Sequence, residues 1–130
     1  MLRPFLRGKI QRARVTRCDV SNVGSVSVDR DLLEACDLLS LERVDVYNIT
    51  RGTRFTTHCV PAPPGSGEVA INGAAVHLAK VGDFVMIAAY CQLDREDVPR
   101  HRARVVLVDE GNRLTEVREQ TPFDLPENEA

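Results

Sequence analysis

The feature that most constrains the fold is the spacing of apolar residues, which repeats every two positions in short runs along most of the chain. In "SVSVD" and "RVDVYNIT", apolar and polar side chains alternate as they do in a strand with one buried face. Turn-forming residues such as Gly52 and Gly111 separate the runs. The pattern predicts eight strands, at residues 9–16, 25–29, 43–50, 54–60, 68–71, 83–91, 102–109 and 113–119.

Two short segments have helical features instead. Asp29 is a suitable N-cap for a helix in "DRDLLEACDLL", and "GAAVHLAKVGD" predicts a shorter helix at 74–80 that ends at Gly82. A chain of 130 residues is long enough for one core. Eight short strands and two short helices therefore predict a single all-β domain, a small closed barrel, because closure removes exposed sheet edges.

Charge is distributed unevenly along the chain. Residues 1–17 carry six basic side chains and no acidic one. The segment after about residue 119 is instead rich in acidic residues and proline, and its apolar residues show no regular spacing. We therefore expect a domain at 1–118 and a mobile acidic tail at 119–130. A basic arm can bind nucleic acid, but the pI near 5.9 and the scarcity of aromatic residues argue against a nucleic-acid partner.

Membrane and metal sites are not expected from the sequence. No apolar run approaches the roughly 20 residues that span a bilayer. The start "MLRPFLRGK" lacks the apolar stretch of a signal peptide. We therefore expect a cytoplasmic protein. The four cysteines form no C-x-x-C pair and the three histidines are dispersed, so we expect core thiols and no metal site.

The dipeptide Gly-Ser occurs twice, in different surroundings. Gly65-Ser66 lies in "PAPPGSG", where prolines and glycines are typical of an ordinary loop. Gly24-Ser25 instead leads directly into a predicted strand. Taken alone, a turn is the simpler interpretation there too, and self-cleavage of the bond is the alternative.

A resemblance bears on that alternative. In order along residues 3–118, "GKIQRARVTRCDV", "GSVSVDRDLLEACDLL", "RVDVYNITRGTRFTTHCV", "GEVAINGAAVHLAKVGD" and "VVLVDEGNRLTEV" resemble the pyruvoyl-dependent aspartate 1-decarboxylases. The resemblance implies a six-stranded double-psi β-barrel and a homotetramer with sites between subunits. It also implies autocatalytic cleavage of a zymogen into residues 1–24 and 25–130. Whether cleavage is spontaneous or needs a maturation partner stays open.

The same resemblance implies a lyase that converts L-aspartate to β-alanine and CO₂ for pantothenate biosynthesis. Its cofactor is a pyruvoyl group derived from Ser25, to which the amino-acid substrate binds as a Schiff base. Gly24, Ser25 and Thr57 are implied in processing, and Ser25 and His58 in catalysis. Substrate contacts are implied for Lys9, Arg54, Thr57, Asn72, Gly73, Ala74 and Ala75. Without the resemblance, these residues are ordinary strand and turn residues.

Three positions depart from the family's usual residues. The family commonly has tyrosine at position 58, histidine at position 11 and tyrosine at position 22, where this chain has His58, Gln11 and Asn22. An imidazolium can donate a proton in place of a phenol, but a strand histidine without a catalytic role is the other interpretation. Two alternatives stay open: a pyruvoyl decarboxylase of another acidic or small amino acid, and an unprocessed barrel that acts as a binding or regulatory subunit.

Overall fold

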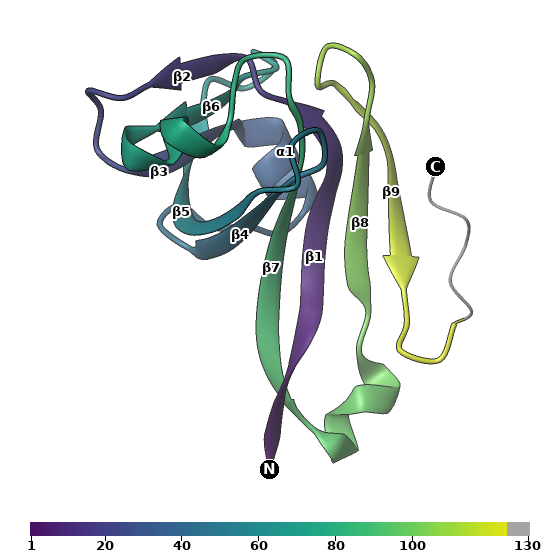
Figure 1. Ribbon diagram of the computed structural model, residues 1–130. Helices are drawn as coiled ribbons and strands as arrows, with labels where there is room; N and C mark the ends of the chain where they lie inside the picture. Colours follow the sequence, from purple (N-terminus) through teal and green to yellow (C-terminus); the bar gives the residue numbers. More distant parts are fainter. Residues whose placement is uncertain (125–130) are drawn as a thin grey trace.

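The computed structural model describes residues 1–124, in which nine strands form one sheet (Figure 1). The strand order is β2-β6-β3-β5-β4-β7-β1-β8-β9. The strands are β1 (Leu2–Arg14), β2 (Arg17–Asp19), β3 (Ser25–Asp29), β4 (Arg43–Asn48), β5 (Arg54–Ala62), β6 (Val69–Asn72), β7 (Phe84–Asp94), β8 (Ala103–Val108) and β9 (Leu114–Gln120). The all-β prediction is confirmed.

Each of the eight predicted strands corresponds to an observed one, and β3 has the predicted bounds. β1 begins seven residues earlier than predicted, at Leu2 rather than at residue 9, because its first half pairs with the far end of β7. β2 was not predicted, since three residues are too few to show a period. The predicted tail at 119–130 lies partly outside the described residues and stays a prediction.

The helical predictions are confirmed with different bounds. Helix α1 (Arg30–Ala35) has Asp29 as its N-cap, and the Asp29 carboxylate accepts hydrogen bonds from the backbone N–H groups of Asp31, Gly65 and Gly67 at 2.9–3.1 Å. The segment predicted at 74–80 is the 3₁₀ helix η1 (Gly73–Leu78). A second 3₁₀ helix, η2 (Arg95–Arg100), was not predicted. It contains a proline that interrupts helical periodicity.

Alternation along the strands sorts side chains onto two faces of the sheet. Val26, Val28 and Ile71 point to one side and belong to a buried apolar cluster. Ser25, Ser27 and Asn72 are sequence neighbours of these apolar residues and share the opposite side, which we call the outer face. The predicted site serine therefore lies outside the apolar core.

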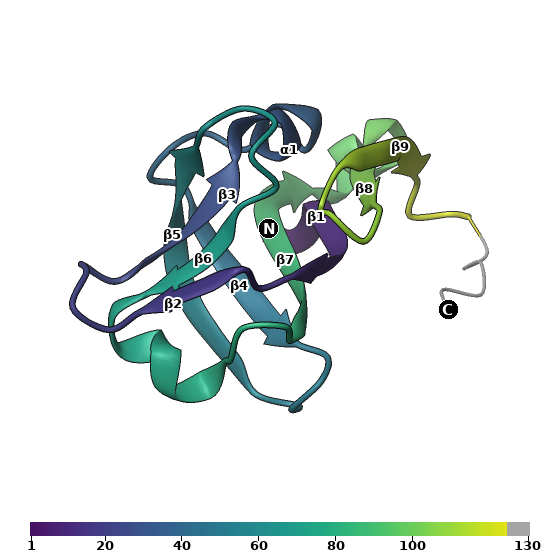
Figure 2. The same ribbon diagram turned by 90° about the horizontal axis from the view of Figure 1, so that it is seen from above.

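The interior strand β1 and the edge strand β2 are almost continuous along the chain. Only Val15 and Thr16 separate them, and the Thr16 N–H donates to the Val69 carbonyl at 2.8 Å, which leads β1 directly to β6. Seen from above, the strands from β2 through to β1 surround a common centre, with β8 and β9 to one side (Figure 2). This arrangement supports a barrel, whereas complete closure and the double-psi topology stay predictions.

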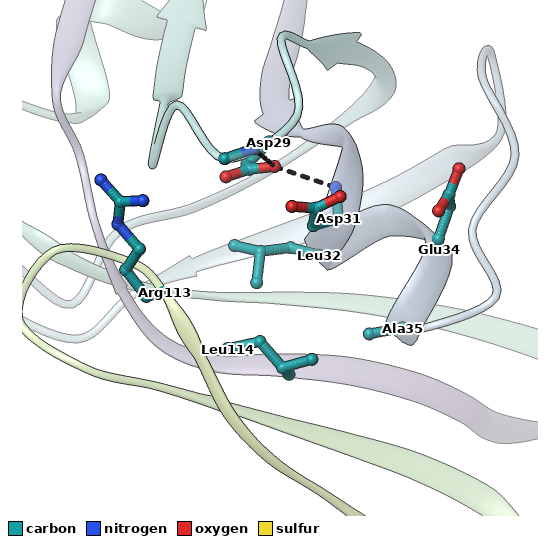
Figure 3. Close-up of a pocket in the computed structure, with 8 residues that line it drawn as sticks. Asp29, Asp31, Leu32, Glu34, Ala35, Arg113 and Leu114 are labelled. Carbon is teal, nitrogen blue, oxygen red and sulfur yellow. Dashed lines mark hydrogen bonds between the residues drawn. The ribbon is translucent and has the colours of Figure 1, made fainter.

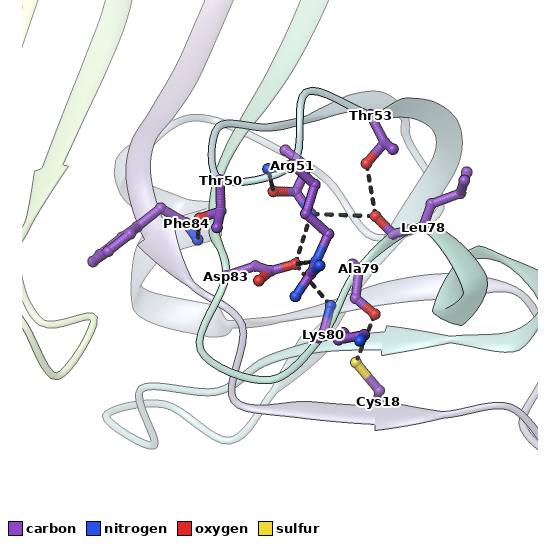
Figure 4. A network of polar contacts seen from close by, with 10 residues as sticks. Cys18, Thr50, Arg51, Thr53, Leu78, Ala79, Lys80, Asp83 and Phe84 are labelled. Atoms are coloured by element: carbon purple, nitrogen blue, oxygen red, sulfur yellow. Dashed lines mark hydrogen bonds and ion pairs between the residues drawn. The ribbon is translucent and has the colours of Figure 1, made fainter.

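A polar network joins the turn after β4 to the start of β7 (Figure 4). One carboxylate oxygen of Asp83 accepts from Asn48 Nδ2 at 2.9 Å, from Arg51 Nε at 2.6 Å and from the Lys80 N–H at 2.8 Å. Burial alone would raise the pKa of Asp83, but these hydrogen bonds and the Arg51 charge together lower it. The network therefore fixes two loops through one ionised group.

Candidate active site

The Gly24–Ser25 bond lies where an exposed loop enters a buried strand. Val23 is 84% exposed and Gly24 is exposed as well, whereas Ser25 is only 7% exposed. No atom outside its chain neighbours lies within 4 Å of the place where a Cβ of Gly24 would be. The Ser25 hydroxyl is 3.5 Å from the Val23 carbonyl. The Ser25 side chain is thus held in the fold, whereas the residue before it is exposed.

Asn72 holds the Ser25 side chain from the neighbouring strand. The two residues are register partners in the antiparallel pair β3–β6. Asn72 Nδ2 donates to Ser25 Oγ at 3.0 Å and to Ser27 Oγ at 2.9 Å. The other end of the same amide, Asn72 Oδ1, is buried and has no hydrogen-bond partner. An unpaired buried acceptor is unusual, because nearly all buried polar groups in native proteins have a hydrogen-bond partner.

Gly73 brings the turn after β6 against the cleavage site. Its φ is +79°, a left-handed conformation that favours glycine. A Cβ at this position would lie 2.7 Å from Gly24 Cα and 3.3 Å from the Asn22 carbonyl oxygen. Ala74 and Ala75 follow in η1, exposed and half-buried. Only glycine at position 73 allows this close approach.

Strand register relates His58 to Ser25. β3 and β5 pair in parallel, with Val26 opposite Cys59. The same register, continued by one residue to the start of β3, sets Ser25 beside His58 on strands about 4.8 Å apart, and Thr57 precedes His58 in β5. His58 therefore shares the outer face with Ser25. Both β5 residues are half-buried.

Lys9 and Arg54 lie elsewhere on the sheet. Lys9 is in β1, which is four steps from β3 in the strand order. Lys9 is only 8% exposed. Arg54 is four residues before His58, roughly 13 Å along β5. Lys9 and Arg54 thus lie on strands other than β3.

Arg54 has aromatic neighbours that the sequence interpretation missed. Its guanidinium lies 4.9 Å from the centre of the Tyr47 ring, and the Tyr47 hydroxyl is 2.9 Å from that of Tyr90. Burial and the Tyr47 hydrogen bond raise the pKa of Tyr90 to about 12. These contacts fix Arg54 at the edge of a cavity of about 300 Å³. Its lining residues are Asp45, Tyr47, Arg54, Phe55 and Thr56.

A larger cavity of about 600 Å³ lies away from these residues (Figure 3). Its lining residues are Asp29, Asp31, Leu32, Glu34, Ala35, Gly65, Arg113 and Leu114. The Asp29 carboxylate in its wall is already used to cap α1 and to bind the Gly65 loop. None of the predicted site residues lines this cavity.

Within residues 1–124, His, Cys, Asp and Glu side chains form no group of three or more that could hold a metal ion. Among the helices of that same part of the chain, none is long and apolar enough to cross a membrane.

The fold and the site define a class: a small all-β protein in which an exposed glycine precedes a buried, amide-held serine. The chain belongs to the aspartate decarboxylase family, because that family's sequence model matches residues 1–115.

Individual relatives agree with this assignment over most of their length. The chain is 44% identical to the aspartate 1-decarboxylase of Leptothrix cholodnii, with 92% of each chain covered. It is 44% identical to the protein of that name from Methylibium petroleiphilum, over 91% of this chain and 98% of the relative. It is 46% identical to the one from Caulobacter vibrioides, over 86% and 95%.

Proposed function

We propose that this chain cleaves itself between Gly24 and Ser25 and then converts L-aspartate to β-alanine and CO₂, which would serve pantothenate biosynthesis. The observation that carries the proposal is the buried Ser25 hydroxyl, 3.0 Å from Asn72 Nδ2, directly after an exposed glycine. The family membership and the names of the relatives support the substrate.

The self-cleavage uses only atoms of this chain and water. Ser25 Oγ attacks the Gly24 carbonyl carbon, the C–N bond breaks, and the hydroxyl proton goes to the Ser25 nitrogen, which leaves an ester. Loss of the Ser25 Cα proton then expels the Gly24 carboxylate and leaves a dehydroalanine. Water replaces its nitrogen, which departs as ammonia, and a pyruvoyl group remains at residue 25.

Placement of the nucleophile contributes more to this cleavage than strain does. Local backbone strain supplies about 1–3 kcal/mol, whereas a well-oriented intramolecular nucleophile can remove about 7–11 kcal/mol of the barrier. A donor to the developing oxyanion adds about 3 kcal/mol. We assign that donor to Thr57, which precedes His58 in β5 and has the role that the family resemblance implies.

The residues around Ser25 fit a pyruvoyl group. Asn72 offers a buried donor and an unpaired acceptor, and the Gly73–Ala75 turn offers backbone N–H groups to an anion. A pyruvoyl group supplies an electron sink for the pair left behind by CO₂. His58, on the same face, donates the proton that replaces CO₂.

Two cations complete the substrate site in this proposal. Arg54 binds a carboxylate through paired N–H groups and Lys9 adds a point charge. The family resemblance implies sites between subunits, and we infer that the chain forms a homotetramer in which such a site brings these cations to the substrate. The four free thiols suit a reducing compartment such as the cytoplasm.

The proposal is tested by incubating the purified protein with L-aspartate and, separately, with L-glutamate. We expect CO₂ and β-alanine from aspartate and much less CO₂ from glutamate. CO₂ from glutamate alone would move the assignment to another acidic amino acid. Release from neither substrate, by protein that stays whole, would favour the non-catalytic barrel.

A further inference from the structure

Ser27 makes a contact that the family resemblance did not include. It follows Ser25 by two residues on β3, so both hydroxyls lie on the outer face. The Asn72 amide lies between them and directs one N–H to Ser25 Oγ at 3.0 Å and the other to Ser27 Oγ at 2.9 Å. Both donors of this amide are therefore used by two serines of one strand.

A second anchor matters because the amide torsion of asparagine is soft. Rotation about the Cβ–Cγ bond has a broad, two-fold energy profile. With Ser25 as its single partner, the amide could rotate and still keep a contact with that hydroxyl, which both donates and accepts. Ser27 uses the second N–H and restricts the rotation. The unpaired Asn72 Oδ1 shows that no contact on the other side performs this task.

The orientation of the Asn72 amide affects two steps of the cleavage: the attack on the Gly24 carbonyl carbon and the later rupture of the Ser25 Cβ–Oγ bond. An N–H at Ser25 Oγ uses one lone pair and leaves the other for the Gly24 carbonyl carbon. When the Cβ–Oγ bond later breaks and the Gly24 carboxylate leaves, negative charge develops on that oxygen, and the same N–H stabilises it. Asn72 must therefore present its donor end to Ser25.

We propose that Ser27 is a positioning residue for self-cleavage, which acts by fixing the Asn72 amide against Ser25. The inference rests on the proposed self-cleavage. Loss of one hydrogen bond is worth about 1 kcal/mol, so removal of the Ser27 hydroxyl should slow cleavage by roughly five- to tenfold.

The test compares three variants with the unchanged protein: Ser27→Ala, Ser27→Thr and Ser27→Val. Threonine and valine have nearly the same shape and differ in the hydroxyl group. Each is purified quickly, and the whole and cleaved chains are followed over time by intact mass. Thermal unfolding of the uncleaved fraction reports whether each variant is folded.

We expect Ser27→Thr to cleave near the unchanged rate, and Ser27→Ala and Ser27→Val to cleave more slowly at similar unfolding temperatures. Equal rates for all four proteins would overturn the role of Ser27 and leave the proposed function intact. Equal slowing by threonine and valine would also overturn it, since shape alone would then explain the effect. If the unchanged protein never cleaves, the proposed function fails first.

Discussion

Gly73 and Gly24 are so close that a single added carbon at Gly73 would lie 2.7 Å from Gly24 Cα. The turn after β6 therefore supports the bond that we expect to break. The same turn carries Asn72, which holds Ser25. One short segment thus positions both sides of the cleavage site.

Gly73→Ala should disturb this support. We expect self-cleavage to slow at least tenfold, because the new Cβ must displace the backbone of Gly24. Gly52→Ala is the matched control: its φ of +77° is nearly that of Gly73, but nothing lies within 4 Å of its Cβ. Both variants should lose about 1–2 kcal/mol of stability from left-handed strain. Intact mass and thermal unfolding measure the two effects, and equal cleavage rates would contradict the role of Gly73.

Asp83→Asn should lower the stability of the folded protein at neutral pH. The ionised carboxylate accepts three hydrogen bonds, and we expect a loss of about 1–3 kcal/mol in the free energy of unfolding. Exposed Asp97→Asn, which breaks a surface pair with Arg100, should change it by less than about 0.5 kcal/mol.

The stabilisation by Asp83 should also depend on pH. Its folded pKa lies below the ordinary value of 3.8, so the contribution is complete above that value and is lost as pH falls through the lower, folded pKa. Urea unfolding of the unchanged protein and of Asp83→Asn should therefore give a difference at pH 7 that shrinks below about pH 4. A difference that is constant down to pH 2 would exclude this account.

Much of the fold was predictable from the two-residue spacing of apolar side chains and from the turn-forming residues between the strands. The bounds of β3 and the cap at Asp29 follow from local sequence, because alternation and capping act within a few residues. Strand pairing cannot be predicted from local sequence in the same way. Asn72 contacts Ser25 from 47 positions away in the chain, and periodicity predicts which face of a strand a side chain lies on but not which strand lies beside it. For that reason the contact of Ser27 with Asn72 was not predicted, although the two-residue spacing of Ser25 and Ser27 showed that they share a face.

His58→Phe should separate cleavage from decarboxylation. Phenylalanine fills the space but cannot donate a proton, so we expect normal self-cleavage and decarboxylation slowed by about a hundredfold. His58→Tyr, which has the family's usual residue, should keep much of the activity. CO₂ release per cleaved chain is the measurement. An unchanged rate in His58→Phe would leave His58 as a strand residue opposite Arg43.

Arg54→Lys should weaken substrate binding while the charge is retained. A lysine lacks the paired N–H groups and the planar contact with Tyr47, so we expect KM for aspartate to rise about tenfold with a smaller change in kcat. Arg30→Lys, at an exposed position of α1, is the control and should leave both constants unchanged. If KM is the same in Arg54→Lys, another residue binds the carboxylate.

The most direct test of the account is the intact mass of the protein after warm incubation, alone and in cell extract, with Ser25→Ala alongside. We predict two chains, residues 1–24 and 25–130, the larger of which lacks the Ser25 amine and reacts with a hydrazide as a ketone does. Ser25→Ala should stay whole. A single uncut chain of unchanged mass in both incubations, inert to the hydrazide, would contradict the account.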